Sequence, residues 1–391
     1  MDMHAPVETP SASAVPAAQP IGRLLSIDAL RGFNMFWILG ADEWIANLAS
    51  TYKNGFTALL ATQMSHTDWE GLRFYDLIFP VFVFIAGVSL VFSLSKIIQQ
   101  KGKLAAVWRV VVRSVLLFGL GVIYYGGLSN AIGDIRLLGV LQRIALCYLF
   151  ASLLFIFFKP RWLVAVCVVL LMGYWALMAL VPVPSSGAGH YEAGRNLANY
   201  VDSKYLPLSK WNGDWDPEGL LSTLPSIGTC LLGVFAGLFL KNETVLGQKK
   251  VYWMVGVGVV SVLLGFLWGY WFPIIKQIWT SSYVLAAGGF SMLALALFYQ
   301  VIEIWKLRRC AAPFIWIGSN AIALYMLFNW PGSPMMGGIF SFHNLASRLA
   351  GGPLQTYVFK QNGELVLSTV VVGLVVWLAY ALYQRKIFIR L

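Results

Sequence analysis

Residues 74–95 read FYDLIFPVFVFIAGVSLVFSLS, and this stretch decides the fold. Asp76 is its only charged residue. As an α-helix it would be roughly 33 Å long, because each residue adds about 1.5 Å. The hydrocarbon core of a membrane is about 30 Å thick. The stretch therefore predicts a helix that crosses a membrane.

The same kind of stretch recurs along the chain. Ten apolar segments are centred near residues 29–49, 74–95, 107–125, 137–158, 162–181, 221–240, 251–272, 282–302, 311–330 and 366–384. Only 12% of the 391 residues are charged and 59% are hydrophobic, whereas a water-soluble protein carries about 25% charged residues. We therefore expect an all-α polytopic membrane protein, a bundle of about ten transmembrane helices with a longer outer-side loop.

The positive charge is distributed unevenly between the two sets of connections. Eighteen Lys and Arg residues fall in one set and nine in the other, and Arg143 lies inside a predicted span. This bias predicts that both termini are cytoplasmic. The net charge of +11 then mostly reflects how the chain is oriented in the membrane. We therefore expect no nucleic acid as a partner.

The ends and the loops complete the expected organisation. Residues 1–22 are rich in Ala, Pro and Ser and predict a disordered leader, and residues 23–391 predict a single transmembrane domain. The outer segments 182–220 and 331–365 could form a cap and a re-entrant segment. The four Cys residues lie in or beside apolar runs, which favours free thiols. No metal-ligand spacing, phosphate-binding loop or GxSxG motif occurs.

Ionisable residues within or beside the predicted spans are candidate functional groups, because burying charge in a membrane is costly. Asp28 and Arg31 are three apart and can pair on one helix face. Asp42 and Glu43 are adjacent, so at most one of them should face the bundle interior. Arg143 must be paired or face a polar cavity, and either a structural role or contact with substrate is open.

The segment QMSHTDWEGLRFYDLIFP, residues 63–80, carries the strongest chemical signal. His66 lies just before a predicted span, close to acids and to Trp69. A histidine in this position suits general acid–base chemistry, although a loop histidine that only donates a hydrogen bond has the same appearance. Trp69 could stack on a sugar or anchor the chain at the membrane interface.

Several motifs in chain order resemble the membrane-bound heparan-alpha-glucosaminide N-acetyltransferase family. They are RLLSIDALRG (23–32), HTDWEGL (66–72), DLIFP (76–80), FVFIAG (82–87), GVLQR (139–143), DPEGLLST (216–223), GSNAI (318–322) and YQRKIF (383–388). Each motif is weak alone, but together they extend over residues 23–391.

The resemblance implies an acetyl-CoA-dependent N-acetyltransferase domain that acts across a membrane. The acetyl group would pass from cytoplasmic acetyl-CoA to the amine of a glucosamine-type sugar on the outer side. His66 corresponds to the family's catalytic histidine and would act as general base or as acetyl carrier. Asp42 stands where the animal enzyme has an Asn near that histidine. Either Asp42 or Asp76 could orient the His66 ring.

The remaining site residues follow from the same expectation. Substrate contacts are expected from Glu43, Trp69, Asp76, Arg143, Asn320 and Tyr325, where Asn320 and Tyr325 could equally make helix–helix hydrogen bonds. The phosphates of acetyl-CoA would meet basic side chains that topology alone could also explain, namely Arg31, Lys101, Lys103, Arg109 and Arg113. No metal is expected.

The cellular setting and two rival functions remain open from sequence. We expect a bacterial inner membrane, with the lipid bilayer, the amino-sugar acceptor and acetyl-CoA as partners, and a homodimer is one assembly that such a bundle could form. A secondary transporter or flippase would also be polytopic, but no matching inverted halves are found. A non-catalytic membrane protein that binds sugar or CoA is the other alternative.

Overall fold

The computed structural model describes residues 24–127, 131–184, 186–328, 345–346 and 362–389. These residues form helices and loops, with three isolated β-bridges and no β-strand. The all-α expectation is confirmed. The leader and most of the segment 331–365, including His343, lie outside the described residues.

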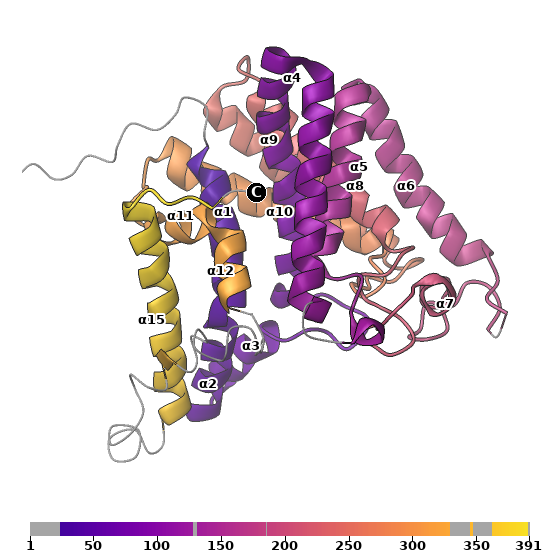
Figure 1. Ribbon diagram of the computed structural model, residues 1–391, viewed down its shortest axis with the longest axis horizontal. Coiled ribbons are helices and arrows are strands. Elements are labelled where there is room, and N and C mark those ends of the chain that lie inside the picture. Colours follow the sequence, from indigo (N-terminus) through magenta and orange to yellow (C-terminus); the bar gives the residue numbers. More distant parts are fainter. Residues whose placement is uncertain (1–23, 128–130, 185, 329–344, 347–361, 390–391) are drawn as a thin grey trace, which may run out of the picture.

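The helices are joined by connections of different lengths, and the connections on either side of α7 are among the longest in the described part of the chain (Figure 1). In chain order they are α1 (Leu25–Phe36), η1 (Trp37–Ala41), α2 (Asp42–Thr51), α3 (Gly55–Gln63), α4 (Phe74–Val122), η2 (Ile123–Gly127), η3 (Ile132–Asp134), α5 (Val140–Phe157), α6 (Pro160–Leu180), α7 (Leu197–Tyr205), α8 (Thr223–Lys241), α9 (Gly247–Trp268), α10 (Ser281–Tyr299), η4 (Gln300–Ile304), α11 (Ala312–Ser319), α12 (Ala321–Phe328) and α15 (Gly363–Gln384).

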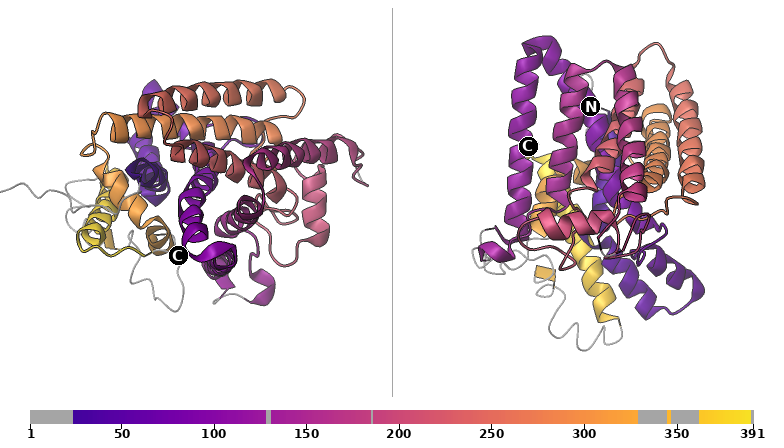
Figure 2. Two further views of the ribbon diagram at one scale, coloured as in Figure 1. Left: turned by 90° about the horizontal axis from the view of Figure 1, so that it is seen from above. Right: turned by 90° about the vertical axis from the view of Figure 1, so that its right-hand side faces the viewer.

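Helix α4 turns back on itself at Gly102, whose φ of 82° and ψ of 174° are not helical. Its first arm, residues 74–101, and its second arm, residues 103–122, therefore run side by side (Figure 1; Figure 2, right). Leu94 and Ala106 belong to the same buried cluster, as do Val91 and Val110. Each arm corresponds to one predicted apolar stretch.

Seven helices among the described residues are long and apolar enough to cross a membrane. The expected count of about ten transmembrane helices is not confirmed. The expected span 29–49 is broken in η1, where Gly40 has a φ of 103°. The expected span 107–125 is continuous with α4, and the span 311–330 is interrupted at Asn320 between α11 and α12.

The bundle core forms where the first arm of α4 meets α5, α8 and α10. α1 packs against α11 through two glycines, because a Cβ on Gly32 would lie 1.7 Å from the Phe314 carbonyl oxygen and one on Gly318 would lie 1.8 Å from the Asp28 carbonyl oxygen. Helices in membranes use such small residues to approach closely. This contact holds α1, and so the segment that leads to Asp42, against the bundle.

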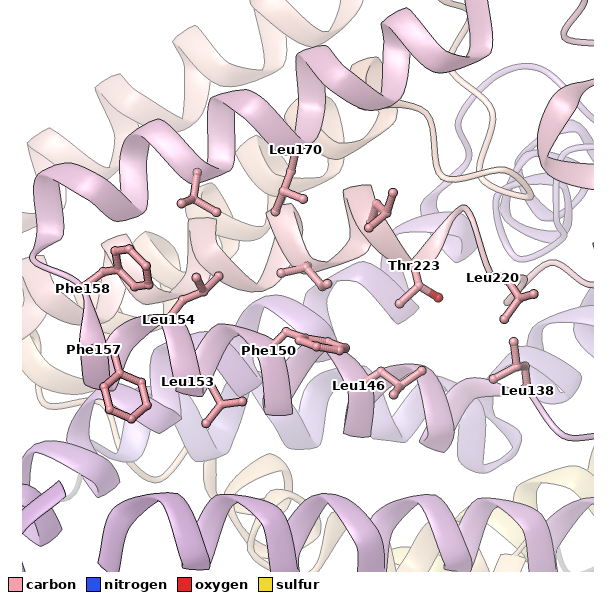
Figure 3. Close-up of a pocket in the computed structure, with 13 residues that line it drawn as sticks. Leu138, Leu146, Phe150, Leu153, Leu154, Phe157, Phe158, Leu170, Leu220 and Thr223 are labelled. Atoms are coloured by element: carbon pink, nitrogen blue, oxygen red, sulfur yellow. The ribbon is translucent and has the colours of Figure 1, made fainter. Parts of the chain in front are cut away.

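An apolar cavity of about 560 Å³ lies between α5, α6 and the start of α8 (Figure 3). Its walls are Leu, Phe, Val and Ile side chains, and Thr223 is the only polar residue among them. This lining suits hydrocarbon and offers no acid–base group, so the chemistry must be sought elsewhere.

Replacing Gly318 by Val should destabilise the protein, because the added side chain must displace backbone of α1. Overpacking costs about 1–3 kcal/mol, so we expect a melting temperature lowered by about 3 °C or more in detergent. Gly373→Val on α15 is the matched control, since no atom lies within 4 Å of a Cβ there. Equal melting temperatures for the two variants would contradict the close packing of α1 and α11.

Candidate functional site

The start of α4 fixes the carboxylate of Asp76. Arg73 is the N-cap residue, and Asp76 in the first turn accepts a hydrogen bond from the Arg73 backbone N–H at 3.2 Å. Acidic residues are favoured in the first helical turn because free N–H groups and the helix dipole meet there. Asp76 is fully buried, so its carboxylate depends on protein partners.

Both carboxylate oxygens of Asp76 are occupied. Oδ2 accepts hydrogen bonds from the backbone N–H of Thr67 at 3.3 Å, its hydroxyl at 3.2 Å, and the Arg73 N–H. Oδ1 lies 2.8 Å from His66 Nδ1 and 3.2 Å from Lys276 Nζ. The backbone carbonyl of Asp76 accepts a hydrogen bond from the Tyr283 hydroxyl at 2.7 Å. This network holds the Nδ1 edge of the His66 ring in place.

The histidine itself is accessible, with 56% of its side chain exposed. Because a carboxylate can only accept hydrogen bonds, its short contact with Nδ1 assigns a proton to that nitrogen. In the neutral ring Nε2 is then the nitrogen with a free lone pair. The Tyr75 ring lies 4.8 Å from the imidazole, and the Arg73 guanidinium donates to the His66 backbone carbonyl at 2.7 Å.

Lys276 completes this cluster from a distant part of the chain. It lies in the connection between α9 and α10, which is tied to the His66 loop by hydrogen bonds from the Gly71 N–H to the Ile274 carbonyl and from the Gln277 side chain to the Asp68 carbonyl. Lys276 Nζ is 3.0 Å from His66 Nδ1. Burial lowers the pKa of Lys276, and the neighbouring Asp76 carboxylate partly offsets that effect.

The sequence did not single out Lys276, which counted only as an outer-side charge. A signal was present, since it is the only Asp, Glu, Lys or Arg residue in the apolar connection 269–280. Tyr75 was also missed, although it lies within the segment 63–80. The pairing of Lys276 with Asp76 is not local in sequence, since 200 residues separate the two.

Asp42 and Glu43 point in different directions, as their adjacency requires. The Asp42 carboxylate accepts a hydrogen bond from the Tyr75 hydroxyl at 2.6 Å, while Glu43 is exposed. Of the two carboxylates that could orient His66, Asp76 contacts its ring directly. Asp42 reaches the ring through Tyr75.

The loop between α6 and α8 packs over the His66 segment. The Trp69 indole N–H donates to the Tyr191 carbonyl at 2.9 Å, and its ring meets Trp215 edge-on at 5.5 Å. Trp69 is therefore half-buried against the predicted cap, which includes α7. His190 in this loop lies 3.5 Å from Glu192 and does not join the cluster around His66.

A buried charge network fastens the same loop. Arg136 bonds both oxygens of Asp216 and also Glu218, and its guanidinium lies 4.7 Å from the Tyr125 ring and 5.0 Å from the Trp211 ring. The two acids of the motif DPEGLLST (216–223) thus bind Arg136 and hold the loop in place. No local sequence pattern had pointed to Arg136 as part of this network.

Arg143 is 1% exposed near the start of α5. Its Nη2 donates to the Gly219 carbonyl and to the Ser222 hydroxyl, and the guanidinium lies 5.1 Å from the Trp279 ring. No carboxylate, Asp76 included, forms an ion pair with Arg143 in the described part of the chain, so of the two expected environments the ion pair is not seen.

Asn320 and Tyr325 lie on a different side of the bundle. The Asn320 side chain donates to the Ile387 carbonyl and accepts from the Ile389 N–H, so it fastens the C-terminal segment. Tyr325 stacks on Tyr124 at 5.0 Å. These contacts are helix-to-helix and helix-to-tail packing, one of the two alternatives that the sequence left open.

The five basic residues expected near acetyl-CoA are spread over two helices. Lys101 and Lys103 are exposed beside the Gly102 turn, and Arg109 is exposed further along the second arm. Arg113 is half-buried with its guanidinium 4.7 Å from the Tyr148 ring. Arg31, on α1, donates to Asp28 at 3.1 Å and to Ser89 at 2.9 Å. The first arm separates the turn from Asp76 by roughly 40 Å, so Lys101 and Lys103 lie at the opposite end of the bundle from His66. Arg31 bonds Ser89 midway along this arm, and Arg113 lies partway back along the second arm.

Comparisons with known proteins identify one family. Residues 23–267 match the family described as heparan-alpha-glucosaminide N-acetyltransferase, catalytic. The mouse heparan-alpha-glucosaminide N-acetyltransferase is 28% identical over an alignment that covers 83% of this chain and 56% of the mouse protein. The human protein of the same name is 28% identical over an alignment that covers 94% of this chain and 59% of the human protein.

The chain belongs to the family of heparan-alpha-glucosaminide N-acetyltransferase catalytic domains, as its motifs predicted. It spans somewhat more than half the length of the curated relatives that it matches. Within the described residues, no group of three or more His, Cys, Asp and Glu side chains could hold a metal ion.

The lowered pKa of Lys276 predicts an alkaline limit to activity. A lysine whose pKa is lowered loses its proton at a lower pH than an ordinary lysine. As the pH rises, a reaction that needs its charge should therefore begin to fail before the ordinary lysine pKa of about 10.4 is reached. Lys276→Arg should move this alkaline limb to higher pH, because arginine does not titrate in this range. Profiles of kcat/KM between pH 6 and 10, recorded for the wild type and for Lys276→Arg, measure the position of this alkaline limb. An alkaline limb that stays in place would show that the charge of Lys276 is not needed.

Proposed function

We propose that this protein is a membrane acetyltransferase that moves an acetyl group from acetyl-CoA to the amine of a glucosamine-type sugar. The observation that carries this proposal is the accessible His66 ring, bonded through Nδ1 to a buried carboxylate. Membership of the N-acetyltransferase family supports the reaction type, and the names of the mouse and human relatives support the acceptor class.

His66 Nε2 is the atom that performs the proton transfer. The sugar ammonium first releases one proton to solvent. The neutral amine nitrogen then attacks the thioester carbonyl carbon, the C–S bond breaks, and a second N–H proton passes to Nε2 and then to the departing thiolate of CoA. Asp76 holds the ring and the tautomer that leaves Nε2 free. The same nitrogen would carry the acetyl group if transfer were stepwise through acetyl-histidine.

Lys276 and Asp42 serve this histidine from two sides. The ammonium of Lys276 balances the buried charge of Asp76, which would otherwise be an uncompensated carboxylate. It also lies close enough to the ring to stabilise the oxyanion that forms when the thioester carbonyl is attacked. Asp42 holds Tyr75, against which the imidazole packs, and Asp42 and Glu43 together add negative charge that favours a cationic amino sugar.

The two substrates would approach from opposite ends of the bundle. Lys101 and Lys103 at the Gly102 turn suit the phosphates of acetyl-CoA, with Arg31, Arg109 and Arg113 further along the helices. The sugar would meet His66 and Trp69 beneath the loop between α6 and α8. With the basic end in the cytoplasm of a bacterium, both termini are cytoplasmic and the sugar lies outside the inner membrane. A homodimer is compatible with this arrangement.

Loss of the His66 side chain should remove most turnover. A general base contributes about 10²–10⁴-fold to the rate, so His66→Ala should retain at most about a hundredth of the wild-type kcat for acetyl transfer to glucosamine. Acetyl-CoA binding and the melting temperature should stay close to wild type, because the phosphates lie at the other end. The assay follows labelled acetyl transfer by purified protein in detergent.

The matched control is His190→Ala, which removes a histidine from the neighbouring loop and should leave kcat unchanged. A His66→Ala protein that keeps more than about a tenth of wild-type kcat would make His66 a bystander. Wild-type protein that binds acetyl-CoA yet acetylates no amino sugar would instead favour a non-catalytic binding protein.

A further inference from the structure

The apolar cavity of Figure 3 results from the way in which α5 and α6 pack. Only residues 158 and 159 connect these two helices, and helices joined by so short a loop commonly form an antiparallel pair. Here α5 and α6 make few direct contacts with each other, and each packs more extensively against α8. The two helices therefore diverge, and the cavity of about 560 Å³ lies between them with the start of α8 as its floor (Figure 3).

This space is open toward the surroundings of the bundle. We call it the α5–α6 groove, and its walls include Phe150, Leu154 and Phe157 of α5 and Val166 and Leu170 of α6. Phe150 is 45% exposed and Phe157 is 60% exposed, so the protein does not cover the groove from outside. An apolar space of this kind does not hold water. In a bilayer, hydrocarbon from the surrounding lipid should therefore fill it.

The groove offers nothing to a polar ligand. The hydroxyl of Thr223, the only polar residue in its lining, donates to the Gly219 carbonyl at 2.9 Å. None of the buried polar atoms that lack a hydrogen-bond partner in the described part of the chain belongs to this lining. Burying a sugar hydroxyl or a phosphate here would cost free energy without any compensating hydrogen bond. The part of a ligand that enters the groove must therefore be hydrocarbon.

The length of the groove suits an acyl chain. Figure 3 shows Phe157, Leu153, Phe150 and Leu146 in a row along α5. From Leu146 to Phe157 the helix rises by about 17 Å. One leaflet supplies about half of the hydrocarbon core, or about 15 Å. A single acyl chain that enters at the Phe157 end therefore extends along this row.

Positive charge lies at that same end of the groove. Lys159 and Arg161 directly follow the lining residue Phe158, and both are exposed. They are the only Asp, Glu, Lys or Arg residues between positions 144 and 191. The Arg161 guanidinium lies 5.7 Å from the ring of Trp162, which is 53% exposed. Because tryptophan favours the membrane interface, this end of the groove is at the level of lipid headgroups.

We propose that the α5–α6 groove binds an anionic phospholipid, with its phosphate beside Lys159 and Arg161 and one acyl chain along the groove. Basic side chains at a membrane surface attract anionic headgroups, and burial of the chain adds an apolar contribution. The bound chain fills the space between α5 and α6, and so supports α5 in its position against α8. The proposal does not depend on the acetyl-transfer reaction.

The headgroup is tested by native mass spectrometry of the full chain in mild detergent, titrated with dioleoyl phosphatidylglycerol or dioleoyl phosphatidylcholine. The wild type should bind phosphatidylglycerol roughly tenfold more tightly or better, because each basic side chain at the surface contributes about fivefold. The double variant Lys159→Gln, Arg161→Gln should lose this preference. The control is Lys249→Gln, Arg308→Gln, which changes exposed residues of segments that do not line the groove and should keep it.

The acyl chain is tested by filling the groove. Val166→Trp places a large side chain in it and should prevent the binding of either lipid. Val169→Trp is the same substitution on the same helix, at a position that is 67% exposed and outside the lining, and should bind both lipids as the wild type does. If Val166→Trp fails to fold, the Lys159→Gln, Arg161→Gln variant still decides the proposal, because it alters only exposed side chains.

Three results would overturn the phospholipid site. They are equal affinity of the wild type for the two lipids, unchanged phosphatidylglycerol binding in the Lys159→Gln, Arg161→Gln variant, and unchanged lipid binding in a folded Val166→Trp protein. A wild-type protein dimer without bound phospholipid would also overturn it, since a second copy of the chain would then cover the groove. None of these measurements involves acetyl transfer, so each leaves the proposed function standing.

Discussion

The arrangement of the site depends on one buried carboxylate. Asp76 is inaccessible to solvent, so it needs a full set of hydrogen-bond donors, and the chain supplies them from three separate segments. The helix start contributes the backbone N–H of Arg73, the preceding loop contributes His66 and Thr67, and the connection before α10 contributes Lys276. Satisfying this charge is what brings the histidine and the lysine together.

The second constraint is the separation of the two ends of the bundle. The arms of α4 run the full length between the basic Gly102 turn and the His66 loop, so the exposed side chains of Lys101 and Lys103 and the exposed His66 imidazole are kept roughly 40 Å apart. A donor with a long neutral arm can bridge part of that distance without moving its charged end through hydrocarbon.

Much of this was predictable from local sequence. The apolar stretches located the helices. Asp76 follows His66 by ten positions, so both residues were already expected at the start of one span. The choice between Asp42 and Asp76 was not predictable, because it depends on the bend at Gly40 that turns Asp42 toward Tyr75. Lys276 and the Arg136 network depend on loops distant in sequence, and single-sequence patterns carry no information on such pairings.

The most direct test of this account compares Asp76→Asn with Asp42→Asn in the same acetyl-transfer assay. If Asp76 holds the His66 tautomer, its amide variant should lose on the order of 10²–10⁴-fold in kcat while still binding acetyl-CoA. Asp42→Asn should lose far less, because it reaches the ring only through Tyr75. Near-normal kcat for Asp76→Asn together with an inactive Asp42→Asn would contradict the central role of the buried carboxylate.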